Sequence, residues 1–521
     1  MLSIRGIRWS GKKGKPVKLL PTGPIVDAFK EYINNELPTR FIDTSTLQFI
    51  SRKDLFPIFQ DEIASVTEEQ IQERIKSFRS DPFATYEPRR ATVLRQIIQE
   101  IVQYVILSHR WDDITGEPTS QDLSGGKRHV ARFKKLSQFC KTSSKLGYKL
   151  AWVDTCCIDK SNAAELSEAI HAMYKWYANA YLCIVYLAES TSYEDWVTDS
   201  WFTRGWTLQE LLAPKRLKFY DKNWRQFVPA GIDDDRKSDA ILHLQKITGI
   251  REAVLAADNS HGVHGRSFWE IMSWASKRRT TRTEDKAYCL IGLFRISLTI
   301  AYGEGHQAFS RLVEAVSEKN PSWDLFAWCG QPSLYHFALP SSPASYSVFE
   351  TGIGKDRIGV QDFTITKYGL SMKSLPPIPI ELSSIVAPEG HRKPFLVNLK
   401  PRYDAKSPRR YSNLVIGCGA TRLNTIREAR QLAVCIINHH GTRSRKQGKL
   451  LVGKEYICFL LYSEEGEDDE TTWMKLTTDS QLRISCLGPE TASGDTVVRA
   501  TDGITLPLVT TFIRSSKSST W

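Results

Sequence analysis

The chain has 521 residues, of which 41% are hydrophobic and 11% aromatic, with a formal net charge of +12 at pH 7. The length favours several domains over a single core, and the hydrophobic content excludes a disordered chain. No window reaches the roughly 18 apolar residues of a membrane-spanning helix, and the N-terminus lacks the apolar core of a secretion signal, so the sequence predicts a cytoplasmic protein without a transmembrane segment.

Residues 1–35 form a basic N-terminal segment. Six lysines and arginines precede the first acidic residue, Asp27. A basic arm can meet nucleic acid, anionic lipid or an organelle import receptor, or it can be a solvated, flexible terminus. No aromatic-interleaved or helix-turn-helix pattern accompanies these charges. We therefore favour the flexible terminus and do not predict a nucleic-acid partner.

Residues 36–99 are predicted to be mainly helical. Pro38–Asp43 suits a short entry strand. Thr67–Phe78 carries apolar residues at helical spacing behind a Thr-x-x-Gln cap. Ala91–Val102 repeats the amphipathic pattern and leads directly into the first strand of the next region.

That first strand is Tyr104–Leu107, a continuous apolar run. Such runs are typical of strands that are buried on both faces in a parallel sheet. Ser108, His109 and Trp111 follow it directly. Polar and aromatic side chains thus stand where the strand leaves the sheet.

The stretch around residues 150–187 has the pattern strand, helix, strand. Leu150–Val153 is apolar and ends at Asp154, and Asp159 closes the turn. From Asn162 the apolar residues recur at helical spacing, and Tyr181–Leu187 is again a strand-like run. Such a unit implies a parallel sheet with a right-handed crossover, so the predicted fold class is α/β.

Polar side chains therefore follow two strands at the edge where doubly wound sheets bind ligands. Ser108, His109 and Trp111 follow the first strand, and Asp154 and Asp159 follow the second. One interpretation is that these groups converge on a single crevice. The other is that His109 and Trp111 are packing residues and Asp154 caps a helix. The sequence leaves both open.

Four sequence blocks of this region occur in a characteristic order: YVILSHRW at 104–111, WVDTCCIDK at 152–160, MYKWY at 173–177 and RGWTLQE at 204–210. A further set follows: MSWAS at 272–276, TRTEDKAYCL at 281–290 and AYGEG at 301–305. The four blocks resemble the fungal heterokaryon incompatibility (HET) domain, over residues 100–225. The further set is similar to the helical extension that often follows this domain, over residues 226–335.

The resemblance implies a role in allorecognition, in which fusion of genetically different fungal cells triggers death of the mixed compartment. It also implies protein partners, through self-association or through an incompatibility partner. HET domains have been compared with Toll/interleukin-receptor (TIR) folds, some of which cleave NAD with a glutamate, so NAD is a candidate substrate and no cofactor is otherwise implied. No G-x-x-x-x-G-K-[ST] sequence is present, so the nucleotide-binding module of several relatives is not expected.

Glu210 is the main candidate for chemistry. A glycine breaks the chain before a short helix, Trp206–Leu212, which places Glu210 beside aromatic residues. A carboxylate there can have a raised pKa and can stabilise an oxocarbenium-like ribose, with Asp154 as the second candidate catalytic residue. Alternatively, Glu210 forms a structural ion pair with Arg204 or Arg216. The candidate ligand-binding residues are Ser108, His109, Trp111, Asp159, Arg204 and Trp206.

Two other functions compete with glycoside cleavage. Cys156 or Cys157, before a helix N-terminus and with His109 nearby, has the ingredients of a Cys–His hydrolase. Vicinal cysteines after a strand are more typical of small buried residues. A non-enzymatic module would act by homotypic or heterotypic assembly through the Trp-rich segment Trp196–Trp206.

None of the ten cysteines forms a C-x-x-C pair, so neither a disulfide framework nor a metal site is predicted.

The sequence changes character in its last third. Short strand-like runs, beginning with Trp323–Trp328 and including Val497–Ala500 and Val509–Ile513, alternate with turn residues. Residues 336–521 are therefore predicted to form a separate β-rich domain, a sandwich or a barrel, of unknown role. The acidic segment Glu464–Glu470 is either a solvated loop or a contact that docks on the basic helical region and restrains the HET domain.

Overall fold

The protein is represented by a computed structural model with two compact units, Met1–His264 and Gly265–Trp521. The division falls inside the predicted 226–335 extension, and the predicted domain limits stay predictions. The residues that the structure describes are 23–77, 86–112, 116–125, 130–229, 231–256, 263, 265–336, 338–347, 362–366, 368–375, 377–386, 395–401, 414–416, 420–423, 431–441, 447–451, 454–463, 473–476, 478, 482–486, 503–507 and 509–514.

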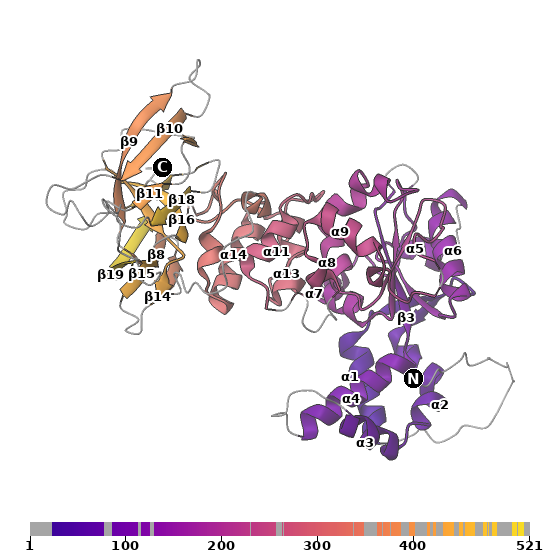
Figure 1. The fold of residues 1–521 in the computed structure, drawn as a ribbon. Helices are drawn as coiled ribbons and strands as arrows, with labels where there is room; N and C mark the ends of the chain where they lie inside the picture. Colours follow the sequence, from indigo (N-terminus) through magenta and orange to yellow (C-terminus); the bar gives the residue numbers. More distant parts are fainter. Residues whose placement is uncertain are drawn as a thin grey trace. The chain divides into compact units, whose positions relative to one another are not determined.

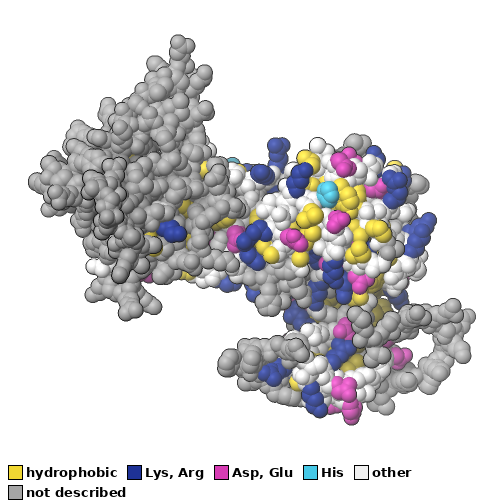
Figure 2. Space-filling model, viewed as in Figure 1, with side chains coloured by type: hydrophobic (Ala, Val, Ile, Leu, Met, Phe, Trp, Pro, Cys, Tyr) yellow, Lys and Arg dark blue, Asp and Glu magenta, His cyan; other side chains and the backbone are white. Residues whose placement is uncertain are grey.

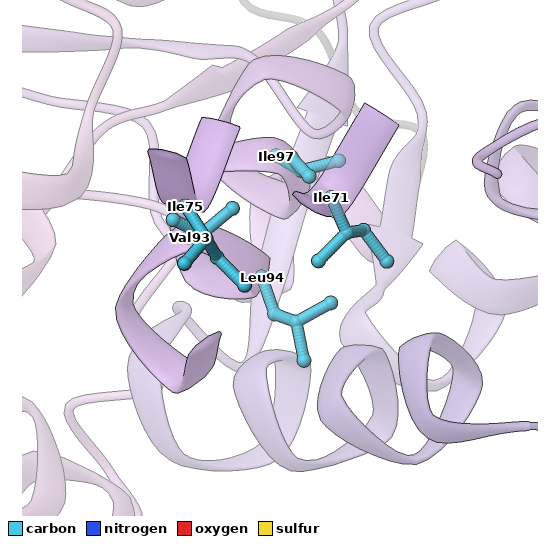
Figure 3. Packing of buried hydrophobic residues seen from close by; sticks show 5 residues of the cluster. All are labelled: Ile71, Ile75, Val93, Leu94 and Ile97. Atoms are coloured by element: carbon cyan, nitrogen blue, oxygen red, sulfur yellow. The ribbon is translucent and has the colours of Figure 1, made fainter. Parts of the chain in front are cut away.

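Four α-helices are described in the N-terminal part of the first unit. They are α1 (Pro24–Glu36), α2 (Leu55–Ala64), α3 (Glu68–Ser77) and α4 (Tyr86–Ile101). Figure 3 shows one contact in this group, where Ile71 and Ile75 of α3 meet Val93, Leu94 and Ile97 of α4. Each helix contributes one apolar stripe, and burying such side chains stabilises the contact by roughly 1.5–3 kcal/mol per residue.

The cap predicted for α3 is confirmed. The Thr67 hydroxyl accepts a hydrogen bond from the Gln70 amide at 3.3 Å, and the Gln70 side chain accepts one from the Thr67 amide at 3.1 Å. These two bonds satisfy amides that the first turn of a helix leaves without partners. Local sequence chemistry therefore sets where this helix begins.

Helix α1 occupies residues for which the sequence predicts a flexible terminus. Its buried side chains are Val26, Phe29, Tyr32 and Ile33, which share one helical stripe. This apolar stripe is short and follows directly on the basic run. The charges of that run outweigh it in the composition of residues 1–35, which is why the sequence predicts a flexible terminus. The basic run itself lies outside the described residues.

A six-stranded sheet forms the centre of the first unit, in the order β2-β1-β4-β3-β5-β6 (Figure 1). Strand β3 pairs in parallel with β4 and β5, and β5 pairs in parallel with β6. The β1–β2 hairpin extends the sheet in antiparallel fashion through β4. The α/β class and the parallel sheet are thereby confirmed. The strands are β1 (Arg40–Asp43), β2 (Phe49–Ser51), β3 (Tyr104–His109), β4 (Leu150–Trp152), β5 (Leu182–Tyr186) and β6 (Leu217–Tyr220).

The order of the parallel strands places a topological switch point between β3 and β5. In chain order the strands β4-β3-β5-β6 are the second, first, third and fourth, an order found in doubly wound sheets. Ligands of such sheets bind outside the carboxyl ends of the strands at the switch point. Ser108 and His109 are the last residues of β3 and so stand at that point. The TIR-like character of the domain stays a prediction.

Helices cover both faces of this sheet. Helices α5 (Ser120–Ser124) and α6 (Val130–Lys145) lie on one side, and α7 (Ala163–Asn179) and α8 (Thr207–Leu212) lie on the other (Figure 1). The predicted start of α7 is confirmed, because the Asn162 side chain accepts hydrogen bonds from the next amides, those of Ala164 and Glu165. Side chains alternate along a strand, so Ser108 and His109 face opposite helical layers.

Two aspartates cap the open edge of β6. The Asp234 carboxylate accepts a hydrogen bond from the Leu217 amide at 3.2 Å, and that of Asp235 accepts one from the Phe219 amide at 2.7 Å. An uncovered edge would present these amides to another strand. The short helices of this unit are η1 (Arg52–Asp54), η2 (Glu194–Val197), η3 (Ser200–Thr203), η4 (Asp235–Lys237), α9 (Ala240–Thr248) and α10 (Glu252–Leu255).

The second unit begins with helices, as the predicted helical extension requires. Trp323–Trp328, predicted as a strand, instead contains a 3-10 helix, so that prediction is wrong. The Asp324 side chain accepts a hydrogen bond from the Trp269 amide at 3.0 Å, a tertiary contact that the local pattern does not reveal. The helices are α11 (Phe268–Ala275), α12 (Asp285–Tyr288), α13 (Ile291–Phe294), α14 (Gln307–Lys319), η5 (Trp323–Phe326) and η6 (Pro343–Tyr346).

The AYGEG block at 301–305 forms a turn that is closed by a carboxylate. Gly303 and Gly305 have φ angles of 105° and 61°, a backbone region that favours glycine. Their amides donate to Glu284 Oε1 at 2.8 and 3.0 Å. Glu304 in turn accepts hydrogen bonds from the Tyr288 hydroxyl and the Arg311 guanidinium, each at 2.6 Å. This block and the TRTEDKAYCL block are therefore joined by several hydrogen bonds.

The described C-terminal strands are all antiparallel, so the β-rich character of this region is confirmed, while the sandwich or barrel arrangement stays a prediction. They form sheets in the orders β11-β18-β16-β13-β9-β10-β12, with β17 beside β16, then β14-β15-β19 and β20-β8-β7. Val497–Ala500 and the acidic segment 464–470 lie outside the described residues. The strands are β7 (Phe363–Thr366), β8 (Gly369–Ser374), β9 (Ile378–Val386), β10 (Phe395–Pro401), β11 (Leu414–Ile416), β12 (Ala420–Leu423), β13 (Gln431–Ile436), β14 (His440–Gly441), β15 (Gln447–Leu451), β16 (Lys454–Ser463), β17 (Met474–Leu476), β18 (Leu482–Cys486), β19 (Gly503–Pro507) and β20 (Val509–Arg514).

Within the described part of the chain, no helix has both the length and the apolar character needed to span a bilayer. The cysteines whose side chains the structure describes are buried free thiols. Both findings concern the described residues alone.

Candidate functional site

Ser108, Trp201 and Glu210 form a buried chain of hydrogen bonds. The Ser108 hydroxyl donates to Glu210 Oε2 at 2.5 Å, and the Trp201 indole N–H donates to Ser108 Oγ at 2.8 Å. Ser108 and Trp201 are fully buried and Glu210 is 7% exposed. Three segments that are distant in sequence therefore meet at the carboxyl end of β3.

Secondary structure holds each member of this chain in place. Ser108 is in β3, on the face covered by α8, which carries Glu210. Trp201 is in η3, whose first turn is capped by Asp199 through a 3.0 Å bond to the Trp201 amide. Tyr177 of α7 completes the layer, and its hydroxyl donates to the Leu107 carbonyl at 3.0 Å.

The Glu210 carboxyl is held in its protonated form at neutral pH. Burial raises the pKa of Glu210 to about 8, and the charge of Asp154 adds to this rise. Interactions with Ser108, Arg204 and Tyr177 oppose the rise without cancelling it. Among the described residues, no cation is in ion-pair contact with Glu210 to stabilise its charge.

The structural ion pair that the sequence leaves open for Glu210 is therefore absent. Arg204 acts on Glu210 through its charge, and Arg216 instead places its guanidinium 4.4 Å from the centre of the Tyr181 ring. Within the described residues, Glu210 is therefore not half of a structural ion pair with Arg204 or Arg216. Its carboxylate accepts a hydrogen bond from the Ser108 hydroxyl, and burial, not this bond, favours the neutral carboxyl over the charged one.

Trp111 and Asp154 lie together beside this chain. The Trp111 indole N–H donates to Asp154 Oδ2 at 2.8 Å, and Trp111 is 37% exposed. Lys160 Nζ lies 3.6 Å from the centre of the Trp111 ring, and Arg204 Cζ lies 5.8 Å from it. Asp154 thus contacts Trp111 directly and also raises the pKa of Glu210, which links the exposed indole to the buried carboxyl.

Trp206 is half-buried at the N-cap of α8, one turn before Glu210. The Glu210 amide donates to the Trp206 carbonyl at 3.5 Å. Trp206 therefore belongs to the same helical turn as the candidate carboxyl. The structure brings together Ser108, Trp111, Asp154, Arg204, Trp206 and Glu210.

His109 lies in a different cluster, on the other face of the sheet. His109 Nε2 is 3.6 Å from Glu117 Oε1, and the Lys135 ammonium contacts the same carboxylate. Burial acts to raise the pKa of Glu117, but His109 and Lys135 outweigh it and lower that pKa to about 2. Because His109 and Ser108 are adjacent in the chain, the sequence predicts that they lie together. Strand alternation separates them.

Asp159 also lies apart from Glu210. Its Oδ1 accepts hydrogen bonds from the Ser161 amide and hydroxyl, at 3.0 and 2.6 Å, and from Gln121 Nε2 at 3.0 Å. These bonds lower the pKa of Asp159, with the Ser161 hydroxyl as the largest cause. The residue therefore shapes the turn before α7 and ties that turn to α5.

The structure argues against two alternative functions, assembly through the indoles of Trp196 and Trp201 and a hydrolase with Cys156 as its nucleophile. Trp196 and Trp201 are fully buried, so the predicted contact surface of indoles across Trp196–Trp206 is wrong for these two residues. Burial raises the pKa of the Cys156 thiol well above its usual range, whereas a nucleophilic thiolate needs a lowered pKa. Cys156 is therefore a buried packing residue.

Lys160 and Tyr177 were missed as site residues. Tyr177 lies on the apolar stripe of α7, where the sequence pattern marks it as core, and its hydroxyl gave no separate signal. Lys160 follows the second aspartate of its block, and only the folded chain places its ammonium on the Trp111 ring. Neither contact follows from spacing along the chain.

Comparison with known proteins assigns a family to part of the chain that forms this site. Residues 104–195 match the family described as Heterokaryon incompatibility protein (HET). The chain is also 38% identical over 234 residues to Vegetative incompatibility protein HET-E-1 of Podospora anserina, a match that covers 42% of this chain and 16% of that protein. The chain thus spans about a sixth of the length of this curated relative. No solved structure matches the chain.

The chain therefore carries a HET domain, and the resemblance found in the sequence blocks is confirmed. The matched residues 104–195 include Ser108, Trp111, Asp154 and Tyr177. Trp201 and Glu210 follow the matched segment. The hydrogen-bond chain thus joins the family-defining part of the domain to the helix that comes directly after it.

Proposed function

We propose that this chain is an incompatibility protein of fungal non-self recognition, and that its HET domain triggers regulated cell death in the cytoplasm. The support is the HET family match and the 38% identity to a vegetative incompatibility protein. That identity covers 16% of the relative, so the trigger and the protein partner are not carried over from it. A partner is proposed on the basis of the incompatibility role itself.

We propose further that the domain acts by cleaving the nicotinamide glycosidic bond of NAD. In this reaction the bond between ribose C1′ and the ring nitrogen breaks, and its electron pair neutralises the pyridinium. Water then adds to the ribosyl oxocarbenium ion and gives up a proton, so the products are nicotinamide, ADP-ribose and a proton. The observation that carries the proposal is the buried Glu210 carboxyl with a pKa of about 8 and no cationic partner among the described residues.

Glu210 in its ionised form would stabilise the oxocarbenium ion and accept the proton of the attacking water. Ser108, through its 2.5 Å hydrogen bond, would hold the carboxylate in one orientation. Asp154 adds a second negative charge in the same region. Two acidic groups beside an exposed indole suit a substrate whose reacting ring is positively charged.

The raised pKa gives the proposal a pH signature. With a pKa of about 8, roughly a tenth of the Glu210 side chains are ionised at pH 7. The rate should therefore rise about fivefold between pH 7 and 8 and reach a plateau about tenfold above the pH 7 rate at higher pH. An acid-catalysed reaction would show the opposite trend.

The test is nicotinamide release from NAD by the purified full chain. Glu210→Gln is expected to lower the rate by at least about 100-fold, since a positioned proton acceptor contributes 10²–10⁴-fold. Glu168→Gln, at an exposed position of α7, is the matched control and should keep full activity. Circular dichroism checks that both variants fold. Equal rates for Glu210→Gln and the unsubstituted chain would exclude this role of Glu210.

A second candidate function, assembly without chemistry, is favoured by one surface observation. Val197 of η2 and Leu242 of α9 are 64% and 55% exposed, beside the stacked rings of Tyr193 and His243 at 4.4 Å. Figure 2 shows hydrophobic side chains gathered on the face over α9. If assembly is the function, Val197→Asp with Leu242→Asp should abolish cross-linked oligomers of the full chain, and NAD should remain intact in its presence.

A further inference from the structure

The exposed Trp111 indole is surrounded by charges of both signs. Lys160 Nζ lies 3.6 Å from the ring centre, within the range of a cation–π contact, and Arg204 Cζ lies at 5.8 Å. The indole N–H donates to Asp154 Oδ2 at 2.8 Å. A carboxylate on the ring N–H increases the electron density of the indole face, which strengthens the attraction for a cation.

Lys160 is held at this position by the ring. Among the described residues, no carboxylate lies within ion-pair distance of its ammonium, and no hydrogen bond from it is found. The nearby Asp154 charge favours the ammonium, whereas burial acts against it and lowers the pKa of Lys160. An ammonium that is partly stripped of water and rests on an indole shows that this face accepts a cation.

We propose that Trp111 and Asp154 form a receptor for a cationic ring, and that Lys160 occupies this receptor until a ligand displaces it. The ligand class is an N-substituted pyridinium, as in an oxidised nicotinamide nucleotide. The reduced ring carries no positive charge and would gain little from the indole face. The inference rests on the proposed function for the identity of the substrate, but the binding step can be tested without any turnover.

Arg204 favours a nucleotide over a simple organic cation. A second positive charge near the ring opposes the binding of a bare cation, and a ligand that also carries phosphate groups offsets it. Once displaced, the Lys160 ammonium would add a second cation for the same phosphates. Trp111 thus selects the charged ring, and the two basic side chains select the nucleotide to which it is attached.

The test uses the full chain and two probes that lack phosphate: 1-methylnicotinamide, which is a pyridinium cation, and nicotinamide, which is neutral. Isothermal titration calorimetry is expected to show tighter binding of the cation. Lys160→Met, which removes the resident ammonium, should tighten binding of the cation by about tenfold. Trp111→Leu should weaken it by at least about tenfold, and Lys53→Met, at an exposed lysine of η1, should change nothing.

Equal affinity for the two probes, or weaker binding of the cation by Lys160→Met, would overturn the inference. Circular dichroism verifies that the Lys160→Met and Trp111→Leu chains fold. The outcome is separable from that of the proposed function. If NAD is not cleaved but the cation binds as expected, the reaction fails and the receptor stands. If NAD is cleaved and the probes bind equally, the receptor fails and the reaction stands.

Discussion

Glu210 of the first unit and Glu284 of the second are both glutamates with little exposed surface, at 7% and 8%, yet their surroundings give them opposite properties. Glu284 accepts hydrogen bonds from two backbone amides, whereas the Glu210 carboxyl accepts one from a hydroxyl. The pKa of Glu284 is lowered, first by its own backbone amide and then, against burial, by Gly303 and Gly305. Burial raises that of Glu210.

The comparison shows that burial alone does not decide what a carboxyl group does. N–H donors stabilise the carboxylate ion and turn Glu284 into a structural link between two sequence blocks. A hydroxyl and an apolar surround leave Glu210 without such stabilisation, so it keeps its proton to an unusually high pH. A group that changes charge near neutral pH is a candidate for chemistry, and a group that stays ionised is a candidate for architecture.

Among the substitutions considered, that of Glu284 should change the free energy of unfolding most. Glu284→Ala should destabilise the second unit by about 3 kcal/mol, because two charge-assisted hydrogen bonds contribute roughly 1.5–3 kcal/mol each. The loss should be the same at pH 6.5 and pH 8, since a lowered pKa keeps the carboxylate ionised at both. Hydrogen exchange of the α14 amides measures it. Glu284→Gln, which retains an acceptor oxygen, should lose less.

The next largest effect is the pH dependence of the free energy of unfolding that Glu210 should cause. Glu210 has a folded pKa of about 8 and an unfolded value of 4.5, so the folded protein holds a proton that the unfolded chain has released. The free energy of unfolding should therefore fall by about 1.4 kcal/mol per pH unit as pH rises from 6.5 to 8, about 2 kcal/mol in total. Glu210→Gln should remove this slope.

Hydrogen exchange of β3 and β5 amides at several pH values measures that slope in the first unit. Glu100→Gln, a substitution in a half-exposed pair with Arg74, is the control and should leave the slope unchanged. A Glu210→Gln protein with the same slope as the unsubstituted chain would show that this carboxyl is ionised in the folded state. The contrast with Glu284 would then disappear.

The smallest effect concerns the Ser108 hydroxyl, which donates to Glu210 where backbone amides donate to Glu284. Ser108→Ala removes the donor to Glu210 and the acceptor for the Trp201 indole, and should cost about 1 kcal/mol of unfolding free energy in the first unit. The Ser108 hydrogen bond lowers the pKa of Glu210, so its loss should move the pH profile of nicotinamide release to higher pH. An unchanged profile would remove Ser108 from the site.

The local elements and the HET domain could be predicted from the sequence alone. The strands near 104 and 150, the caps at Thr67 and Asn162, and the helix that carries Glu210 follow from apolar periodicity and from side chains that bond to neighbouring amides. Ordered blocks of residues identified the HET domain. All these signals are short-range along the chain, which is why a sequence reveals them.

Which polar residues meet, in contrast, depends on how the chain folds in three dimensions. Strand alternation sent His109 to Glu117 and Ser108 to Glu210, although the two residues are adjacent. The contact of Lys160 with Trp111 joins residues that are distant in the chain. The protonation state of Glu210 depends on desolvation by many neighbours at once, and desolvation is a property of the packed interior. No spacing rule along the sequence encodes it.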